Sequence, residues 1–178
     1  MSEDVNTVSD LLVAKRNGKS EKFNSEKIEK AILNAMKSSG IKSPKVAFNI
    51  SKEIEEELKE KGYKLAVCSN ASNWELDVIL KKLEVKDYFD VIQGVTSKNN
   101  KKYSLEELLL REKPELAVMV GDRSYDNEAA RYNQIPFVGC KYGYGKPEEL
   151  RECQYTIETV LELPKIIDKI VSIRGGTA

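Results

Sequence analysis

From Tyr63 onward, short apolar runs alternate with longer segments of helical periodicity, and this alternation constrains the fold more than any other feature. Strands and helices that alternate in this way are typical of a parallel sheet with helices on both faces. Strands are predicted for residues 64–68, 88–92, 116–120, 136–139 and 155–157. Helices are predicted for residues 73–83, 104–112, 126–133 and 163–173. The fold class that follows is α/β.

The first 60 residues predict a small α+β module made of a hairpin and helices. Strand-like residues at 11–15 and 20–23 flank the turn dipeptide Asn17-Gly18. Two amphipathic helices follow, from about residue 25 to Gly40 and over 44–60. The composition changes near Gly62, so we expect two domains, residues 1–60 and residues 61–178.

Composition excludes several classes of function. The 178 residues include no histidine, which removes Ser-His-Asp triads, Cys-His pairs and histidine-bound metals. Lysine plus arginine (29) equals aspartate plus glutamate (29), so no overall charge favours nucleic acid or an anionic membrane. No apolar run reaches the roughly 20 residues that span a bilayer, and the start lacks a secretory pattern. We therefore expect a cytoplasmic protein.

Polar residues follow three of the predicted strands at the edge where ligands of open α/β sheets gather. Ser69 follows the first of these strands and offers a hydroxyl near a helix start, which suits a phosphate oxygen. Asp122 and Asp126 follow a later strand, and such a pair of carboxylates can hold Mg²⁺. The helix between them begins with lysines that can neutralise phosphate charge, namely Lys98, Lys101 and Lys102.

These segments resemble the haloacid dehalogenase (HAD) superfamily, in particular its phosphoglycolate phosphatase-like branch. The resemblance covers about residues 54–170 and is carried by GYKLAVCSNAS and VMVGDRSYDNEAARYNQIPFVGCKYGYGKPEEL. It implies a Rossmann-like parallel sheet and catalysis of phosphate-ester hydrolysis. Ser69 would bind phosphate, Lys102 or Lys101 would stabilise the charged intermediate, and Asp122 with Asp126 would hold Mg²⁺.

One part of the superfamily pattern is missing. Its enzymes attack phosphate with the first aspartate of a DxD motif that follows a central strand, and no two aspartates of this sequence have that spacing. The central strand of the sheet is therefore uncertain. We expect residues 11–14 either to fill that position or to form a separate hairpin; otherwise the strands ending at Ser69 and Asp122 must pair directly or through a homodimer.

The hairpin region also resembles the ATP-cone, a nucleotide-binding regulatory module of ribonucleotide reductases, through VAKRNGKSEKFNSEKIEKAILNAM. This resemblance implies ATP as a ligand, with Lys15, Arg16 and Lys27 at the phosphates and Gly18 allowing close backbone approach. Two other interpretations remain: a basic hairpin without a ligand, and a degenerate first strand and cap of the phosphatase fold.

The leading hypothesis is a protein that binds a nucleotide or another small phosphate compound on a phosphatase scaffold with little or no catalysis. The alternative is a Mg²⁺-dependent phosphatase acting on a small phosphomonoester, with its nucleophile or a strand coming from elsewhere. A third is a recombined or designed chain without evolved activity. Whether the chain is an enzyme stays open at this level.

Overall fold

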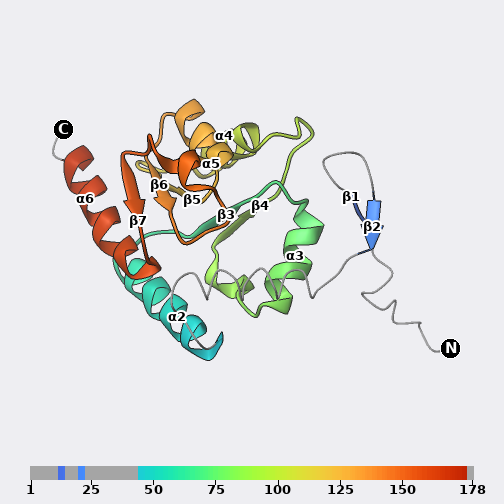
Figure 1. Cartoon of the computed structure of the whole chain (residues 1–178), viewed down its shortest axis with the longest axis horizontal. Helices are drawn as coiled ribbons and strands as arrows, with labels where there is room; N and C mark the ends of the chain where they lie inside the picture. Colours follow the sequence, from blue (N-terminus) through green and yellow to red (C-terminus); the bar gives the residue numbers. More distant parts are fainter. Residues whose placement is uncertain (1–11, 15–19, 23–43, 176–178) are drawn as a thin grey trace.

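Parallel strands with helices on both sides form the body of the molecule (Figure 1). The computed structural model describes residues 12–14, 20–22 and 44–175. The parallel strands are β3 (Ala66–Cys68), β4 (Val91–Gln93), β5 (Met119–Gly121), β6 (Phe137–Cys140) and β7 (Tyr155–Ile157). β3 pairs with β4, and β5, β6 and β7 form a second ladder in that order. The predicted α/β class with parallel strands is confirmed.

Helices occupy most of the chain between these strands, as predicted. They are α2 (Pro44–Glu60), α3 (Asn73–Lys82), α4 (Lys101–Glu112), α5 (Ser124–Tyr132) and α6 (Leu163–Gly175). Single 3₁₀ turns cover Lys86–Tyr88, Pro147–Leu150 and Val160–Glu162. None of the helices in the described ranges is long and apolar enough to cross a lipid bilayer.

Two boundaries differ from the prediction for local reasons. α4 begins at Lys101 instead of residue 104, because the side-chain oxygen of Asn100 accepts a hydrogen bond from the amide of Lys102 at 3.1 Å. β4 begins later than expected because Lys86–Tyr88 forms a 3₁₀ turn before it. The first shift matters for function, since it places a lysine in the opening turn of the helix.

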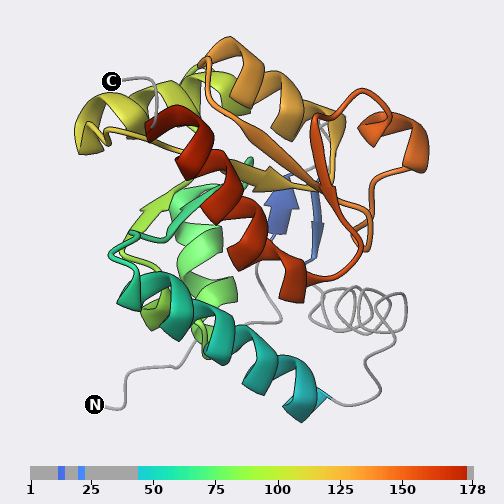
Figure 2. The same cartoon turned by 90° about the vertical axis from the view of Figure 1, so that its left-hand side faces the viewer.

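The face of the sheet covered by α4 and α5 carries one hydrophobic core. Its buried members come from both helices, from β5 and β6, and from the turn before β7: Leu105, Met119, Ala129, Ala130, Phe137 and Leu150. Burial of each large side chain contributes about 1.5–3 kcal/mol. This core fixes α4 and α5 beside each other over the strands, as Figure 2 shows.

The opposite face is covered by α2 and α6. Ile54 and Leu58 lie one turn apart on α2 and pack against Ile167 of α6. The ammonium of Lys61, just after α2, donates to Glu57 and to Asp168 of α6, both at 2.9 Å. The first and last helices of the α/β part are therefore joined to each other.

The N-terminal hairpin is present. β1 (Leu12–Ala14) pairs antiparallel with β2 (Ser20–Lys22), with Ala14 opposite Ser20. Of the two expected arrangements for this segment, the structure thus has the hairpin. The helix expected from residue 25 lies outside the described residues, and the division into residues 1–60 and 61–178 stays a prediction.

Candidate functional site

Ser69 lies at the carboxyl end of β3 in a tight turn. Its amide donates to the carbonyl of Gln93 at 3.0 Å, which keeps the strand end aligned with β4. Its hydroxyl oxygen accepts from the amide of Ala71 at 3.1 Å. Because a hydroxyl both accepts and donates, the O–H of Ser69 remains able to donate to a ligand oxygen.

The turn continues directly into α3 through a capping box. The hydroxyl oxygen of Ser72 accepts from the amide of Glu75 at 3.2 Å, and the carboxylate of Glu75 accepts from the amide of Ser72 at 2.8 Å. This reciprocal pair satisfies two amides that would otherwise lack partners at the start of the helix. It fixes the start of α3 shortly after the Ser69 turn.

Lys101 is the lysine that the structure brings to the acidic residues. Its ammonium lies 2.5 Å from a carboxylate oxygen of Asp126, and the two side chains are only 14% and 5% exposed. Lys102 instead lies over the rings of Tyr103 and Tyr132, at 5.1 and 5.2 Å from the centroids. Lys98 lies over the same Tyr103 ring. Sequence spacing left Lys101 and Lys102 as alternatives; the opening turn of α4 separates them.

Asp126 organises the turn between β5 and α5. Its second carboxylate oxygen accepts from the amides of Asp122 and Arg123, at 3.2 and 3.1 Å. A side chain added at Gly121 would overlap this carboxylate, so the strand end requires a glycine. With Lys101 on its other oxygen, Asp126 has both oxygens engaged within the protein.

Asp122 lies beneath the loop that follows β6. One of its carboxylate oxygens accepts from the amides of Tyr144 and Gly145, the latter at 3.1 Å. A Cβ at Gly143 would overlap the Asp122 side chain, and one at Gly145 would overlap the Asp122 carbonyl. The KYGYG segment therefore shapes the acidic turn. The sequence contained this signal in its closely spaced glycines, although their partner could not be read from it.

Glu149 stabilises the same turn through hydrogen bonds to Arg123 and Ser124. Its carboxylate accepts from the amide and the hydroxyl of Ser124 and from Arg123 at 2.9–3.1 Å. The amides of Ser124 and Lys146, followed by the Arg123 guanidinium, lower the pKa of Glu149 to about 2. Sequence reasoning missed this residue, because its partners Arg123 and Ser124 lie about 25 residues away along the chain.

The side chain of Cys68 packs against the core that contains Leu105 of α4 and Met119 of β5, so these segments converge. Burial raises the pKa of the Cys68 thiol to about 11, while the nearby charges of Lys101 and Asp126 lower and raise it, respectively. Cys68 immediately precedes Ser69, so the end of β3, the start of α4 and the acidic turn lie at one edge of the sheet. This is the edge at which ligands of α/β sheets bind.

The fit of Mg²⁺ to these residues is incomplete. Mg²⁺ prefers an octahedron of oxygen ligands, usually with one or two carboxylates. Within the described ranges, no group of three or more Asp, Glu, Cys or His side chains is arranged to hold a metal ion. Both carboxylate oxygens of Asp126 already accept hydrogen bonds, one from Lys101 and the other from backbone amides. Asp122 has one carboxylate oxygen that does not accept from the loop. These residues alone do not build a magnesium centre.

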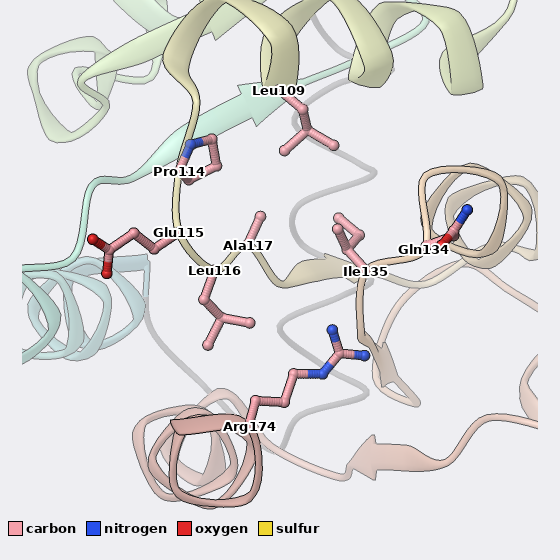
Figure 3. A pocket seen from close by; sticks show the side chains of 8 residues that line it. All are labelled: Leu109, Pro114, Glu115, Leu116, Ala117, Gln134, Ile135 and Arg174. Carbon is pink, nitrogen blue, oxygen red and sulfur yellow. The ribbon is translucent and has the colours of Figure 1, made fainter. Parts of the chain in front are cut away.

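A cavity of about 250 Å³ lies elsewhere, around the residues that precede β5 and β6 (Figure 3). Its lining residues are Leu109, Pro114, Glu115, Leu116, Ala117, Gln134, Ile135 and Arg174. Asp122 follows β5, so the cavity and the acidic turn are at opposite ends of that strand. The nucleotide-binding residues expected in the N-terminal module, Lys15, Arg16, Gly18 and Lys27, lie outside the described residues.

Proteins from several bacteria are similar to this chain in sequence. The phosphoglycolate phosphatase of Aquifex aeolicus is 35% identical over 118 residues, which are 64% of this chain and 55% of that protein. The tyrosine-protein kinase PtkA of Mycobacterium tuberculosis is 30% identical over 108 residues, 58% of this chain and 37% of that protein. The chain thus spans about half the length, or less, of these relatives.

Solved structures agree with the sequence matches. A predicted phosphatase from Clostridium acetobutylicum superposes with a TM-score of 0.61 at 29% identity, covering 66% of this chain and 58% of that one. The structure of Mycobacterium tuberculosis PtkA gives a TM-score of 0.54 at 28% identity. The sequence profile of haloacid dehalogenase-like hydrolases matches residues 7–140. The chain therefore belongs to the haloacid dehalogenase-like hydrolase family.

Proposed function

We propose that the α/β part of the chain binds the phosphate group of a small phosphomonoester and acts as a phosphatase-type site. The observation that supports this most is the buried pair of Lys101 and Asp126, at the edge where Ser69 and Asp122 also lie. Several relatives are phosphatases and one is a kinase, so transfer of a phosphoryl group is the chemistry that their names share. These comparisons favour the phosphatase hypothesis over the nucleotide-binding one.

Two donors would hold the phosphate. The hydroxyl of Ser69 would donate to one oxygen, and the ammonium of Lys101 would neutralise charge on another. Asp126 would position Lys101 and the backbone of the acidic turn, since its oxygens already accept from both. Asp122 would offer its remaining carboxylate oxygen toward the ligand.

Hydrolysis needs a nucleophile that these residues do not provide. The sequence has no pair of aspartates with DxD spacing, and Asp126 is held by an ion pair and two amides. An added carboxylate would supply both the nucleophile and a further ligand for Mg²⁺, which we propose as the cofactor. Without a nucleophile, we expect the site to bind the phosphate group of an ester with little hydrolysis.

The test compares Lys101→Met with its neighbour Lys102→Met. Binding of inorganic phosphate is measured by calorimetry, and release of p-nitrophenol from p-nitrophenyl phosphate is followed with and without Mg²⁺. We expect Lys101→Met to weaken phosphate binding at least about tenfold, because a charge-assisted hydrogen bond is lost. Lys102→Met should change it by less than about twofold, because the structure places the Lys102 ammonium over the rings of Tyr103 and Tyr132 instead of at Asp126. Equal effects of the two substitutions would contradict the proposed site.

The hairpin favours a second proposal, that the N-terminal module binds ATP through Lys15, Arg16, Gly18 and Lys27. The support is the antiparallel pairing of β1 with β2, which the module's resemblance requires. Calorimetric titration of the full chain with ATP and Mg²⁺ tests it. Lys15→Ala should weaken binding, and Lys22→Ala, in β2, is the matched control; a titration without saturable heat would refute the proposal.

A further inference from the structure

The cavity that precedes β5 and β6 is separate from the candidate phosphate site (Figure 3). The end of α4, the segments that lead into β5 and β6, and the end of α6 surround it. Its volume of about 250 Å³ equals that of about eight water molecules in the liquid, which suits a ligand of roughly eight or nine non-hydrogen atoms. Neither Lys101 nor Asp122 is among the lining residues, so a ligand here would leave the phosphate site open.

Two turns after helices give the cavity its shape. Lys113, the residue after α4, has a left-handed backbone with φ 47°, and its amide donates to the carbonyl of Leu109 at 2.9 Å. Pro114 follows and cannot extend the helix. Gln134, after α5, has φ 56°, and its amide donates to the carbonyl of Arg131 at 3.2 Å. Because main-chain hydrogen bonds hold both turns, the cavity forms together with the fold, as ligand pockets usually do.

The walls of the cavity are mostly apolar. Leu109 and Ile135 are partly buried and pack against the hydrophobic core beneath α4 and α5. Leu116 and Ala117 are partly buried in the segment just before β5. Such walls favour an apolar ligand body, because its surface leaves water on binding. A ligand that is polar all round would lose its hydration here without gaining enough hydrogen bonds.

One charged group reaches these apolar walls. In Figure 3 the guanidinium of Arg174, in the last turn of α6, extends toward Leu116 and Ile135, whereas the carboxylate of Glu115 extends away from them. A guanidinium has five N–H donors in a planar fork, so it can bind a carboxylate with two parallel hydrogen bonds and still donate to other partners. It is also weakly hydrated, which suits it to a site beside apolar side chains. The charge that faces the cavity is therefore positive.

We infer that this cavity binds a small monocarboxylic acid, as its carboxylate, with a compact apolar body such as one aromatic ring. The apolar body lies against Leu109, Leu116 and Ile135, and the carboxylate pairs with the guanidinium of Arg174. The volume limits the body to a single ring, and the apolar walls disfavour a second charged group. This site goes beyond the proposed function and does not depend on it.

Titration of the full chain with benzoate and with benzamide tests this inference, because the two probes share size and shape and only benzoate carries a charge. Backbone amide shifts, measured by NMR on isotope-labelled protein, locate the binding site. We expect benzoate to shift the amides of Ala117 and Ile135 saturably and to bind at least about tenfold more tightly than benzamide. The amides of Ser69 and Asp122 serve as internal controls, because they belong to the candidate phosphate site.

Three variants identify the group that selects the anion. Arg174→Met removes the guanidinium and keeps most of the aliphatic chain, so benzoate affinity should fall at least about tenfold while benzamide affinity changes by less than about twofold. Arg174→Lys keeps the charge without the planar fork and should restore only part of the affinity. Arg151→Met is the matched control, because Arg151 is 73% exposed and pairs with Glu148 outside the cavity. This variant should bind benzoate as the unaltered chain does.

Four results would overturn the inference. They are the absence of saturable shifts with benzoate, equal affinities for benzoate and benzamide, an unchanged benzoate affinity in Arg174→Met, and shifts that gather at Ser69 and Asp122 instead of at Ala117 and Ile135. The comparison of the two probes uses the unaltered chain, so it is decisive even where a variant fails to fold. Titration with inorganic phosphate reads the other site separately, so a failure here is distinguishable from a failure of the proposed function.

Discussion

Removal of the Asp126 charge should destabilise the fold more than removal of its partner's charge. Asp126 is 4% exposed and holds the ammonium of Lys101 and two backbone amides. Asp126→Asn leaves a buried ammonium without a counter-charge, and we expect a loss of about 3–5 kcal/mol in the free energy of unfolding. Lys101→Met leaves a carboxylate that still accepts from two amides, so the expected loss is smaller, about 2 kcal/mol.

Urea denaturation of the two variants, followed by circular dichroism, measures this difference. The double variant Asp126→Asn/Lys101→Met should be less destabilised than the sum of the single changes, because it leaves no unpaired buried charge. A larger loss for Lys101→Met than for Asp126→Asn would refute the reasoning. It would mean that the buried carboxylate, left without its counter-charge, costs more than the buried ammonium does.

Three further predictions concern the surroundings of the site. The pKa of Glu149 is lowered to about 2, so its stabilising contribution is full above the unfolded value of about 4.3 and is lost as pH falls toward 2; Glu149→Gln should flatten this part of a stability profile against pH. Gly145→Ala forces a Cβ onto backbone and should lower the midpoint of thermal unfolding more than Gly139→Ala, whose Cβ would meet side-chain methyl groups of Leu150 and Thr156 at 3.1–3.4 Å. Burial raises the pKa of Cys68 to about 11, so at pH 8 only about one thiol in a thousand is ionised, and mass spectrometry should find it alkylated far faster in urea than in the native protein.

The sequence predicted most of the α/β part because each of its elements has a local signature. Helix α3 has a serine cap with a glutamate three residues on, and α2 has apolar residues one turn apart. Ser69 and the acidic turn could be proposed as site residues because polar residues that follow apolar strands gather at one edge of a parallel sheet. Such signals depend on neighbours in the sequence.

The remaining features depend on contacts between distant residues. Lys101 and Lys102 are adjacent, and only the start of α4 at Asn100 determines which of them faces Asp126. Glu149 meets Ser124 through the fold of the loop after β6. That no ladder joins β3 to β5 among the described residues likewise follows from which strands are neighbours, which no local pattern encodes.

The contact between α2 and α6 has a consequence for the order of folding during synthesis. Lys61 and Asp168 are 107 residues apart, and the apolar face of α2 packs on α6. That face stays uncovered on the ribosome until nearly all of the α/β part has been made. At about 5–20 residues per second, the apolar face of α2 stays exposed for roughly 5–20 seconds. During that time a chaperone or a neighbouring nascent chain can bind this face before α6 does.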